Sequence, residues 1–205
     1  MKKVGIVDYG MGNLDSVVRA VEECGGDPIV IATPYAFNSV NSIILPGVGA
    51  FATGMQNIRE RGLEEALNTQ LVSKGIPTLG VCLGMQLLAT QGDEGGETRG
   101  LGWIEGEVKR LAPNGQDHRI PHVGWNEVLF AQDSLLFKGV PSGKDFYFVH
   151  SYYLKCKNRE DVIATTPYCG GFASAVGRGN ILGVQFHPEK SQRVGFQVIR
   201  NFLAL

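Results

Sequence analysis

The stretch TLGVCLGMQ, at residues 78–86, runs from an apolar segment through a cysteine into a helical pattern, with Gly80 and Gly84 two residues on either side of Cys82. This is the pattern of a nucleophile elbow, a sharp strand-to-helix turn, with sulfur in place of the serine oxygen. Glycine is needed there because neighbouring backbone comes too close for a Cβ. The cysteine lies at a helix N-terminus, where the dipole favours the thiolate, so we expect Cys82 to be a nucleophile.

The elbow lies within an alternation of short β-branched runs and longer helical patterns that fills the first ninety residues, which is typical of βαβ units and a parallel sheet. After Gly102 the strand-like segments crowd together with short turns, so we expect antiparallel or mixed strands to extend that sheet. The sequence therefore predicts an α/β fold, with one domain over residues 1–205. The expected strands are residues 4–8, 28–32, 41–45, 77–81, 103–111, 125–130, 146–149, 152–156, 162–166, 173–176 and 181–186, and the expected helices are 14–24, 53–74 with a break near Gly62, 83–90 and 192–203.

Composition excludes several classes of partner. Lys and Arg number 19 against 20 Asp and Glu, a net charge of −1, so no global field attracts nucleic acid or an acidic membrane surface. Apolar runs are far too short to cross a bilayer. Four cysteines stand far apart, with no Cys-x-x-Cys and no histidine at metal-ligand spacing. We expect a reduced, cytoplasmic protein without a metal.

A cysteine nucleophile needs a base, and the base needs a group that orients it. Among the four histidines, His187 is favoured because it follows an apolar strand and precedes Pro-Glu, so that Glu189 can hold one ring nitrogen. His150 is the rival base, although no carboxylate follows it closely, and His118 is expected in a loop. The sequence therefore predicts a triad of Cys82, His187 and Glu189.

Acyl transfer also needs hydrogen-bond donors for the oxyanion. The geometry of an elbow offers the N–H of Leu83, the residue after the nucleophile. The turn PGVG at residues 46–49 follows a strand at the same sheet edge and could supply a second backbone N–H, from Val48 or Gly49; its other interpretation is an ordinary glycine-rich turn. The segment 8–13 suggests a dinucleotide fingerprint, but Asp15 stands where the third glycine belongs.

The motifs GVCLGMQ at residues 80–86 and HPE at 187–189 resemble those of the class I, or triad-type, glutamine amidotransferases. The segments 8–14, 45–51, 121–126 and 147–152 narrow the resemblance to the glutaminase subunits of imidazole glycerol phosphate synthases, from histidine biosynthesis, over nearly the whole chain. The resemblance implies a flavodoxin-like three-layer α/β sandwich, with a mixed central sheet and a parallel core. It implies no cofactor.

The resemblance also implies a reaction. Cys82 attacks the side-chain amide of L-glutamine, His187 protonates the departing ammonia, and water hydrolyses the γ-glutamyl thioester. Gln86 and the backbone at Ser151 and Tyr152 would hold the carboxylate end of glutamine. Glu94, or alternatively Asp93, would accept its α-ammonium group. The implied substrate-binding residues are Gly49, Gly84, Gln86, Glu94, Ser151 and Tyr152.

Ammonia released into water is protonated and diluted, so such a subunit is useful only when it is docked on an enzyme that consumes ammonia. The partner that the resemblance implies is a cyclase subunit of (β/α)₈-barrel fold, in a heterodimer. The implied interface residues are Asn13, His122, Trp125, Asn126, Tyr147 and Lys190. Trp125 is the expected anchor, because exposed aromatic side chains concentrate binding energy, and its alternative is an ordinary core tryptophan.

Partner or ligand binding could also rotate the 47–49 peptide, which glycines make sterically easy, so the isolated chain should be a poor glutaminase.

Other functions remain open at this point. A paralogous subunit would supply ammonia to an amidine-forming enzyme of bacterial surface-sugar synthesis. A cysteine γ-glutamyl hydrolase or peptidase of similar fold would instead cleave polyglutamyl chains or peptides. A non-catalytic binding module is the third possibility, and it would be favoured only if Cys82 resisted alkylation by an electrophile that mimics glutamine.

Overall fold

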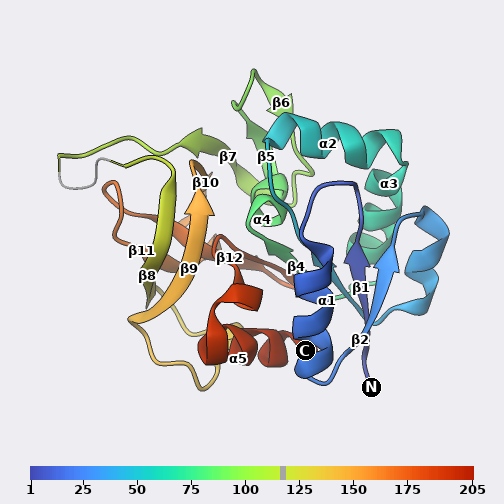
Figure 1. Cartoon of the computed structure of the whole chain (residues 1–205). Helices are drawn as coiled ribbons and strands as arrows, with labels where there is room; N and C mark the ends of the chain where they lie inside the picture. Colours follow the sequence, from blue (N-terminus) through green and yellow to red (C-terminus); the bar gives the residue numbers. More distant parts are fainter. Residues whose placement is uncertain (116–118) are drawn as a thin grey trace.

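The computed structural model describes residues 1–115 and 119–205, so His118 lies outside the described residues. A nine-stranded sheet forms the centre of the molecule (Figure 1). In spatial order its strands are β2 (Asp27–Ile31), β1 (Lys3–Val7), β3 (Ser42–Leu45), β4 (Thr78–Val81), β13 (Ile181–Val184), β12 (Phe172–Arg178), β11 (Val162–Thr166), β8 (His122–Phe130) and β9 (Lys144–His150). The first five are parallel and the rest pair antiparallel, which confirms the expected mixed sheet with a parallel core.

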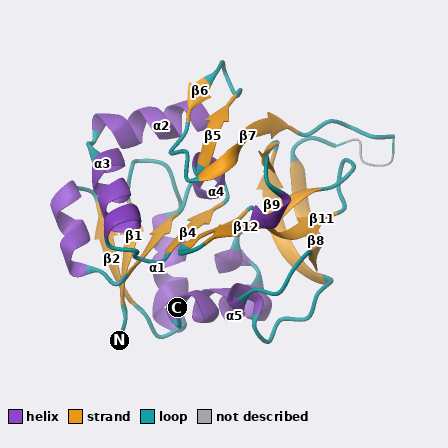
Figure 2. Cartoon of the chain, turned by 180° about the vertical axis from the view of Figure 1, so that it is seen from behind, coloured by secondary structure: helices purple, strands orange, loops and turns teal. Residues whose placement is uncertain are grey.

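Helices cover both faces of the parallel core (Figure 2). They are α1 (Leu14–Glu23), α2 (Phe51–Glu60), α3 (Leu63–Asn68), α4 (Leu83–Leu87) and α5 (Gln192–Leu203), and α3 continues as a π-helical turn over Thr69–Ser73. Alternate residues of each strand point to opposite faces. Val4 and Ile6 pack with α1 and α5, whereas Val7 packs with α2, α3 and α4. The two hydrophobic cores therefore make the three-layer sandwich that the resemblance implies.

A second sheet was not expected. It has the order β10 (Tyr152–Cys156), β7 (Ile104–Arg110), β5 (Ala89–Gly92) and β6 (Thr98–Arg99). The expected strands 103–111 and 152–156 therefore exist but leave the main sheet. The helix expected over 83–90 ends at Leu87, because the carbonyls of Leu87 and Leu88 accept hydrogen bonds from the backbone N–H groups of Leu101 and Trp103. Long-range pairing overrides the local helical pattern.

The register of β3, β4 and β13 brings the three segments that follow these strands to one edge of the sheet. β4 pairs in parallel with β3 on one side and with β13 on the other. Ligands bind at the carboxyl edge of such a sheet, and here the 46–49 turn, the elbow and the 185–189 segment all follow strands that end there.

None of the helices in the two described ranges has the length and apolar character needed to span a bilayer.

The elbow has the strained geometry that its glycines predict. Cys82 has a φ of 55° and a ψ of −111°, an unusual conformation for a residue with a side chain. A Cβ on Gly84 would overlap the carbonyl oxygen of Leu45, and one on Gly80 would lie 2.6 Å from the Gly84 oxygen. Only glycine fits at these two positions, because the obstacles are backbone atoms.

Substitution of Gly84 tests this packing. We expect Gly84→Ala to lower the free energy of unfolding by at least about 2 kcal/mol, because the new methyl group must displace strand β3. Gly12→Ala is the matched control: its Cβ would meet no atom closer than 3.6 Å, and we expect a change within about 0.5 kcal/mol. Denaturant unfolding measures both values, and equal stabilities for the two variants would contradict the close approach.

Candidate active site

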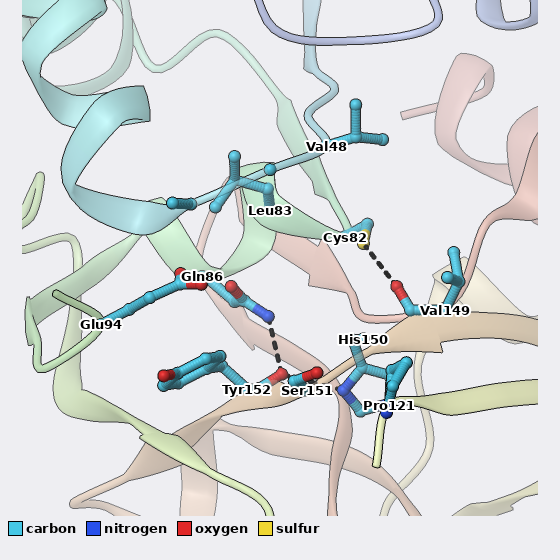
Figure 3. A pocket seen from close by; sticks show the side chains of 12 residues that line it. Val48, Cys82, Leu83, Gln86, Glu94, Pro121, Val149, His150, Ser151 and Tyr152 are labelled. Carbon is cyan, nitrogen blue, oxygen red and sulfur yellow. Dashed lines mark hydrogen bonds between the residues drawn. The ribbon is translucent and has the colours of Figure 1, made fainter.

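A cavity of about 490 Å³ opens at the carboxyl edge of the sheet, and Cys82 lies in its wall (Figure 3). Of the residues expected at the substrate site, the cavity is lined by Gly49, Gln86, Glu94, Ser151 and Tyr152, and Val48 and Leu83 line it as well. Gly84 does not line it, which corrects the expectation for that residue. Its Cα faces the Leu45 carbonyl, beneath the elbow.

Cys82 is held between two polar groups. Its side chain is buried, and its sulfur lies 3.8 Å from the carbonyl oxygen of Val149, to which the thiol donates. The side-chain amide of Gln185 donates to the sulfur from 3.7 Å. Gln185 is fully buried and belongs to the segment after β13, and sequence reasoning did not single it out. Its place at the end of an apolar strand, two residues before His187, was the available signal.

His187 and Glu189 form a buried pair. Nδ1 of His187 lies 2.8 Å from Oε1 of Glu189, and both side chains are only 3% exposed. The other ring nitrogen, Nε2, is buried and makes no hydrogen bond with a described residue. Burial lowers the pKa of His187, but a thiolate at Cys82 and the Glu189 carboxylate outweigh burial and raise the pKa to about 10. The fold therefore brings all three residues of the expected triad together.

The rival base, His150, is engaged elsewhere. Its Nδ1 lies 2.8 Å from the carbonyl oxygen of Tyr152, and its Nε2 lies 3.0 Å from Nδ1 of His122. Burial lowers its pKa to about 3. Because both ring nitrogens already have partners other than Cys82, the geometry favours His187 as the base.

The expected oxyanion donor is occupied. The N–H of Leu83 donates to the carbonyl oxygen of Gly47, at 3.3 Å. Gly49 has a φ of 110°, a conformation that side chains rarely adopt. Tyr9, for which the sequence suggested no role, is fully buried directly against Gly47, and its hydroxyl makes no hydrogen bond with a described residue. An oxyanion at Cys82 can use the Leu83 N–H only after the Gly47 carbonyl turns away.

Of the residues expected to bind glutamine, Gln86 does not suit its expected role, whereas Glu94 is placed where it can bind a ligand. Nε2 of Gln86 donates to the Tyr152 carbonyl at 2.7 Å (Figure 3). It also donates to Oε1 of Gln185 at 3.1 Å. Both amide hydrogens are thereby used, so the expected hydrogen bond from the Gln86 side chain to a carboxylate does not fit, and its oxygen is suited to a donor. Glu94 accepts the N–H of Phe51 with Oε2, at 2.8 Å, and lines the cavity.

Asp93, the alternative to Glu94, points elsewhere. Its carboxylate lies 3.3 Å from Nζ of Lys109 and is about half exposed, and Asp93 is not among the residues that line the cavity. This arrangement favours Glu94 as the partner of an ammonium group.

Within the described ranges, no three His, Cys, Asp or Glu side chains gather as a metal ion would require.

Most residues expected at the interface lie on the surface. Trp125 is 47% exposed, which excludes a core tryptophan, and its ring centroid lies 6.1 Å from that of Tyr147 on the neighbouring strand. Nζ of Lys190 lies 6.0 Å from the Tyr147 ring, and Asn13 is exposed. The exposed Val123 and Val149 stand opposite each other in the β8–β9 pair, as do Trp125 and Tyr147, and these four residues are called the β8–β9 patch below.

His122 departs from that expectation. It is only 4% exposed and stacks between Phe148 and Tyr168, with ring centroids 4.9 and 4.0 Å away. Side chains alternate along β8, so His122 and Asn126 share the inner face while Val123 and Trp125 face outward. His122 is therefore not a contact residue. Asn126, which is partly buried, donates to it.

Comparisons with known proteins identify the family of the chain. Residues 5–205 match the family described as glutamine amidotransferase class-I. The chain is 48% identical over 202 residues to the imidazole glycerol phosphate synthase subunit HisH of Moorella thermoacetica, with 98% of this chain and 94% of that protein covered. It is 43% identical over 209 residues to the same subunit of Caulobacter vibrioides, with 99% and 98% covered.

Solved structures show the likeness of fold. PurLQS from Thermotoga maritima superposes with a TM-score of 0.76 at 19% identity, over 100% of this chain and 99% of that one. A glutamine amidotransferase from the same organism gives a TM-score of 0.65 at 20% identity, over 94% of this chain and 78% of that one. By fold, by its elbow and by near-complete sequence coverage, the chain belongs to the class I glutamine amidotransferases, in the group of the HisH subunits of imidazole glycerol phosphate synthase.

Proposed function

We propose that this chain hydrolyses L-glutamine to glutamate and ammonia, as the glutaminase subunit of an imidazole glycerol phosphate synthase. The observation that carries the proposal is the Cys82 sulfur at a strained elbow, beside an imidazole that a buried carboxylate orients, in the wall of a cavity of about 490 Å³. The similarity to HisH subunits over 98% of the chain favours histidine biosynthesis over the surface-sugar and peptidase alternatives.

The proposed reaction has two halves. The Cys82 thiolate attacks the side-chain carbonyl carbon of glutamine, and the carbonyl electron pair moves to oxygen. When the oxyanion collapses, the C–N bond breaks, and Nε2 of His187 gives its proton to the departing nitrogen, which leaves as ammonia. His187 then takes a proton from water, the hydroxide oxygen attacks the thioester carbon, and the C–S bond breaks to release glutamate and restore the cysteine.

The raised pKa of His187 suits it to protonate the departing ammonia in the first half of the reaction. Because its pKa is about 10, the ring is protonated at neutral pH and holds the proton that ammonia needs. Glu189 stabilises this imidazolium ion and fixes the ring so that Nε2, and not Nδ1, remains available. Glu94 is assigned to the α-ammonium group, because its carboxylate lines the cavity and is held by the N–H of Phe51.

The ammonia must reach an enzyme that consumes it. We assign the β8–β9 patch, with Lys190 and Asn13, to a cyclase subunit of (β/α)₈-barrel fold, in a cytoplasmic heterodimer that acts as a lyase. Val149 belongs both to the patch and to the cavity wall, so a partner on the patch lies next to the place where ammonia is made. The exposed ring of Trp125, packed against the partly buried ring of Tyr147, is the anchor that such an interface favours.

Removal of the nucleophile tests the function. In a complex with the cyclase subunit, we expect Cys82→Ala to lower glutamine-dependent synthesis by at least about 10⁴-fold, because no thioester can form. Synthesis from added ammonium salts is the control and should persist, since it bypasses Cys82. The variant should not rescue a histidine auxotroph that lacks this subunit, whereas the wild-type gene should. Glutamine-dependent activity in the variant, or failure of the wild-type gene to rescue, would refute the proposal.

Glu189→Gln tests the charge state of His187. We expect the pKa of His187 to fall below about 10, because the variant lacks the carboxylate that offsets the effect of burial. We also expect kcat to fall by about 10²- to 10⁴-fold. A folded pKa above the unfolded value near 6.5 stabilises the protein fully below pH 6.5, and this stabilisation is lost as pH rises through 10. NMR titration of the ring measures the pKa, with the exposed Glu97→Gln as control. A wild-type ring that titrates near 6.5 would contradict the prediction.

Because the Leu83 N–H is hydrogen-bonded to the Gly47 carbonyl, we expect the enzyme to become active only when this carbonyl turns away. We expect the isolated chain to release glutamate at least about 10²-fold more slowly than the complex, because one oxyanion donor is worth a factor of this size. The measurement is glutamate release by the chain alone and by its complex with the ligand-bound cyclase. Full activity of the chain alone would rule out a gate at Gly47.

A further inference from the structure

Two buried imidazoles beside the cavity have no part in the proposed chemistry. His122 on β8 and His150 on β9 are paired residues in the antiparallel ladder, and Nδ1 of His122 lies 3.0 Å from Nε2 of His150. The exposed fractions of the two side chains are 4% and 6%. Aromatic rings pack against both, with Phe148 and Tyr168 on His122 and Phe172 at 4.8 Å from His150. Such a pair requires an explanation, because burying two ionisable groups costs free energy.

The direction of the hydrogen bond between the two rings is fixed from one end. The Tyr152 carbonyl can only accept, so Nδ1 of His150, at 2.8 Å, carries a hydrogen. His150 is neutral because burial lowers its pKa to about 3, and its Nε2 is therefore an acceptor. It follows that Nδ1 of His122 carries the hydrogen that bridges the two rings.

The other end agrees with this assignment. Oδ1 of Asn126 accepts the N–H of Glu127 at 2.9 Å, which turns the amide nitrogen toward His122. That nitrogen lies 3.2 Å from Nε2 of His122, which must accept. Donors therefore run one way, from Asn126 through His122 and His150 to the Tyr152 carbonyl.

The chain of hydrogen bonds continues to the nucleophile. The Tyr152 carbonyl also accepts from Nε2 of Gln86, at 2.7 Å (Figure 3). Gln86 donates its second hydrogen to Gln185, and the amide of Gln185 donates to the Cys82 sulfur. The Tyr152 carbonyl is held in place because it accepts two hydrogen bonds of normal length, and it holds the Gln86 amide in turn. The side-chain oxygen of Gln86 is therefore the atom left for a ligand.

We propose that His122 and His150 are positioning residues, a one-way hydrogen-bond relay from Asn126 that fixes the Tyr152 carbonyl and, through it, the Gln86 amide in the glutamine site. This inference rests on the proposed glutaminase function. Loss of the His150 N–H frees the Tyr152 carbonyl to turn, and Gln86 can then present either end of its amide to the cavity. Glutamine binding suffers, while the intrinsic reactivity of the sulfur does not.

Imidazole ¹⁵N NMR on the wild-type chain tests the relay without any substitution. At pH 7 we expect both His122 and His150 to be neutral and protonated on Nδ1, with Nε2 bare. Either ring protonated on Nε2 at that pH, alone or as a cation, would overturn the assigned direction and with it the proposal.

Two variants of His150 test the function of the relay. His150→Leu removes the donor to Tyr152, whereas His150→Asn keeps an amide N–H where Nδ1 stood. The probe is labelling of Cys82 by a chloroketone analogue of glutamine, compared with labelling by iodoacetamide, which needs no glutamine site. We expect the Leu variant to need about tenfold more analogue for half-maximal labelling, the effect of about one hydrogen bond, with an unchanged maximal rate. The Asn variant should stay within about threefold of wild type.

The outcomes separate the two proposals. If, in the complex with the ligand-bound cyclase, iodoacetamide labels Cys82 of the wild type and the glutamine analogue does not, the glutaminase proposal fails. If the analogue labels wild type and the Leu variant at the same concentrations, the relay proposal fails while the glutaminase proposal stands. Equal reduction in the Leu and Asn variants would also overturn the relay, because the retained N–H would then have no effect. Should the Leu variant not fold, the tautomers of the wild-type rings still decide.

Discussion

The contact between Gly84 and the Leu45 carbonyl is the constraint on which the rest of the site depends. It holds the first turn of α4 against the end of β3, with no space for a side chain between them. The parallel register of β3, β4 and β13 then leaves little freedom in where Cys82 and the segment after β13 can lie. Sheet pairing and one close backbone approach together assemble the proposed catalytic geometry from residues that are far apart in the chain.

His187 and His150 show how local surroundings set opposite charge states. His187 has a buried carboxylate and the cysteine as neighbours, which raise its pKa, whereas His150 has a carbonyl and a second imidazole, and burial lowers its pKa. Environments that push titratable groups apart in this way separate an acid–base residue from a structural one. A protonated ring can hold a proton for ammonia, and a neutral ring can hold a hydrogen-bond direction.

Sequence alone predicted the features that are local in the chain. The elbow depends on residues within five positions of one another, and the His-Pro-Glu segment places an acid beside its histidine, so both could be recognised. The small sheet could not, because β6 has two residues and β5 pairs with a strand more than a dozen residues further on. The occupied Leu83 N–H was also hidden, since its partner is a backbone carbonyl that carries no sequence signal. The burial of His122 depends on which face of β8 turns inward, and the position of that strand in the sheet decides this.

The central claim is that sulfur at position 82 becomes covalently joined to the glutamyl group during turnover. The most direct measurement is mass spectrometry of the cyclase complex, quenched in acid milliseconds after it is mixed with glutamine and then digested. The account predicts that the peptide containing Cys82 gains the mass of one γ-glutamyl group, and that hydroxylamine removes it. Steady turnover of glutamine with the added mass on another residue, or with none on any peptide, would contradict it.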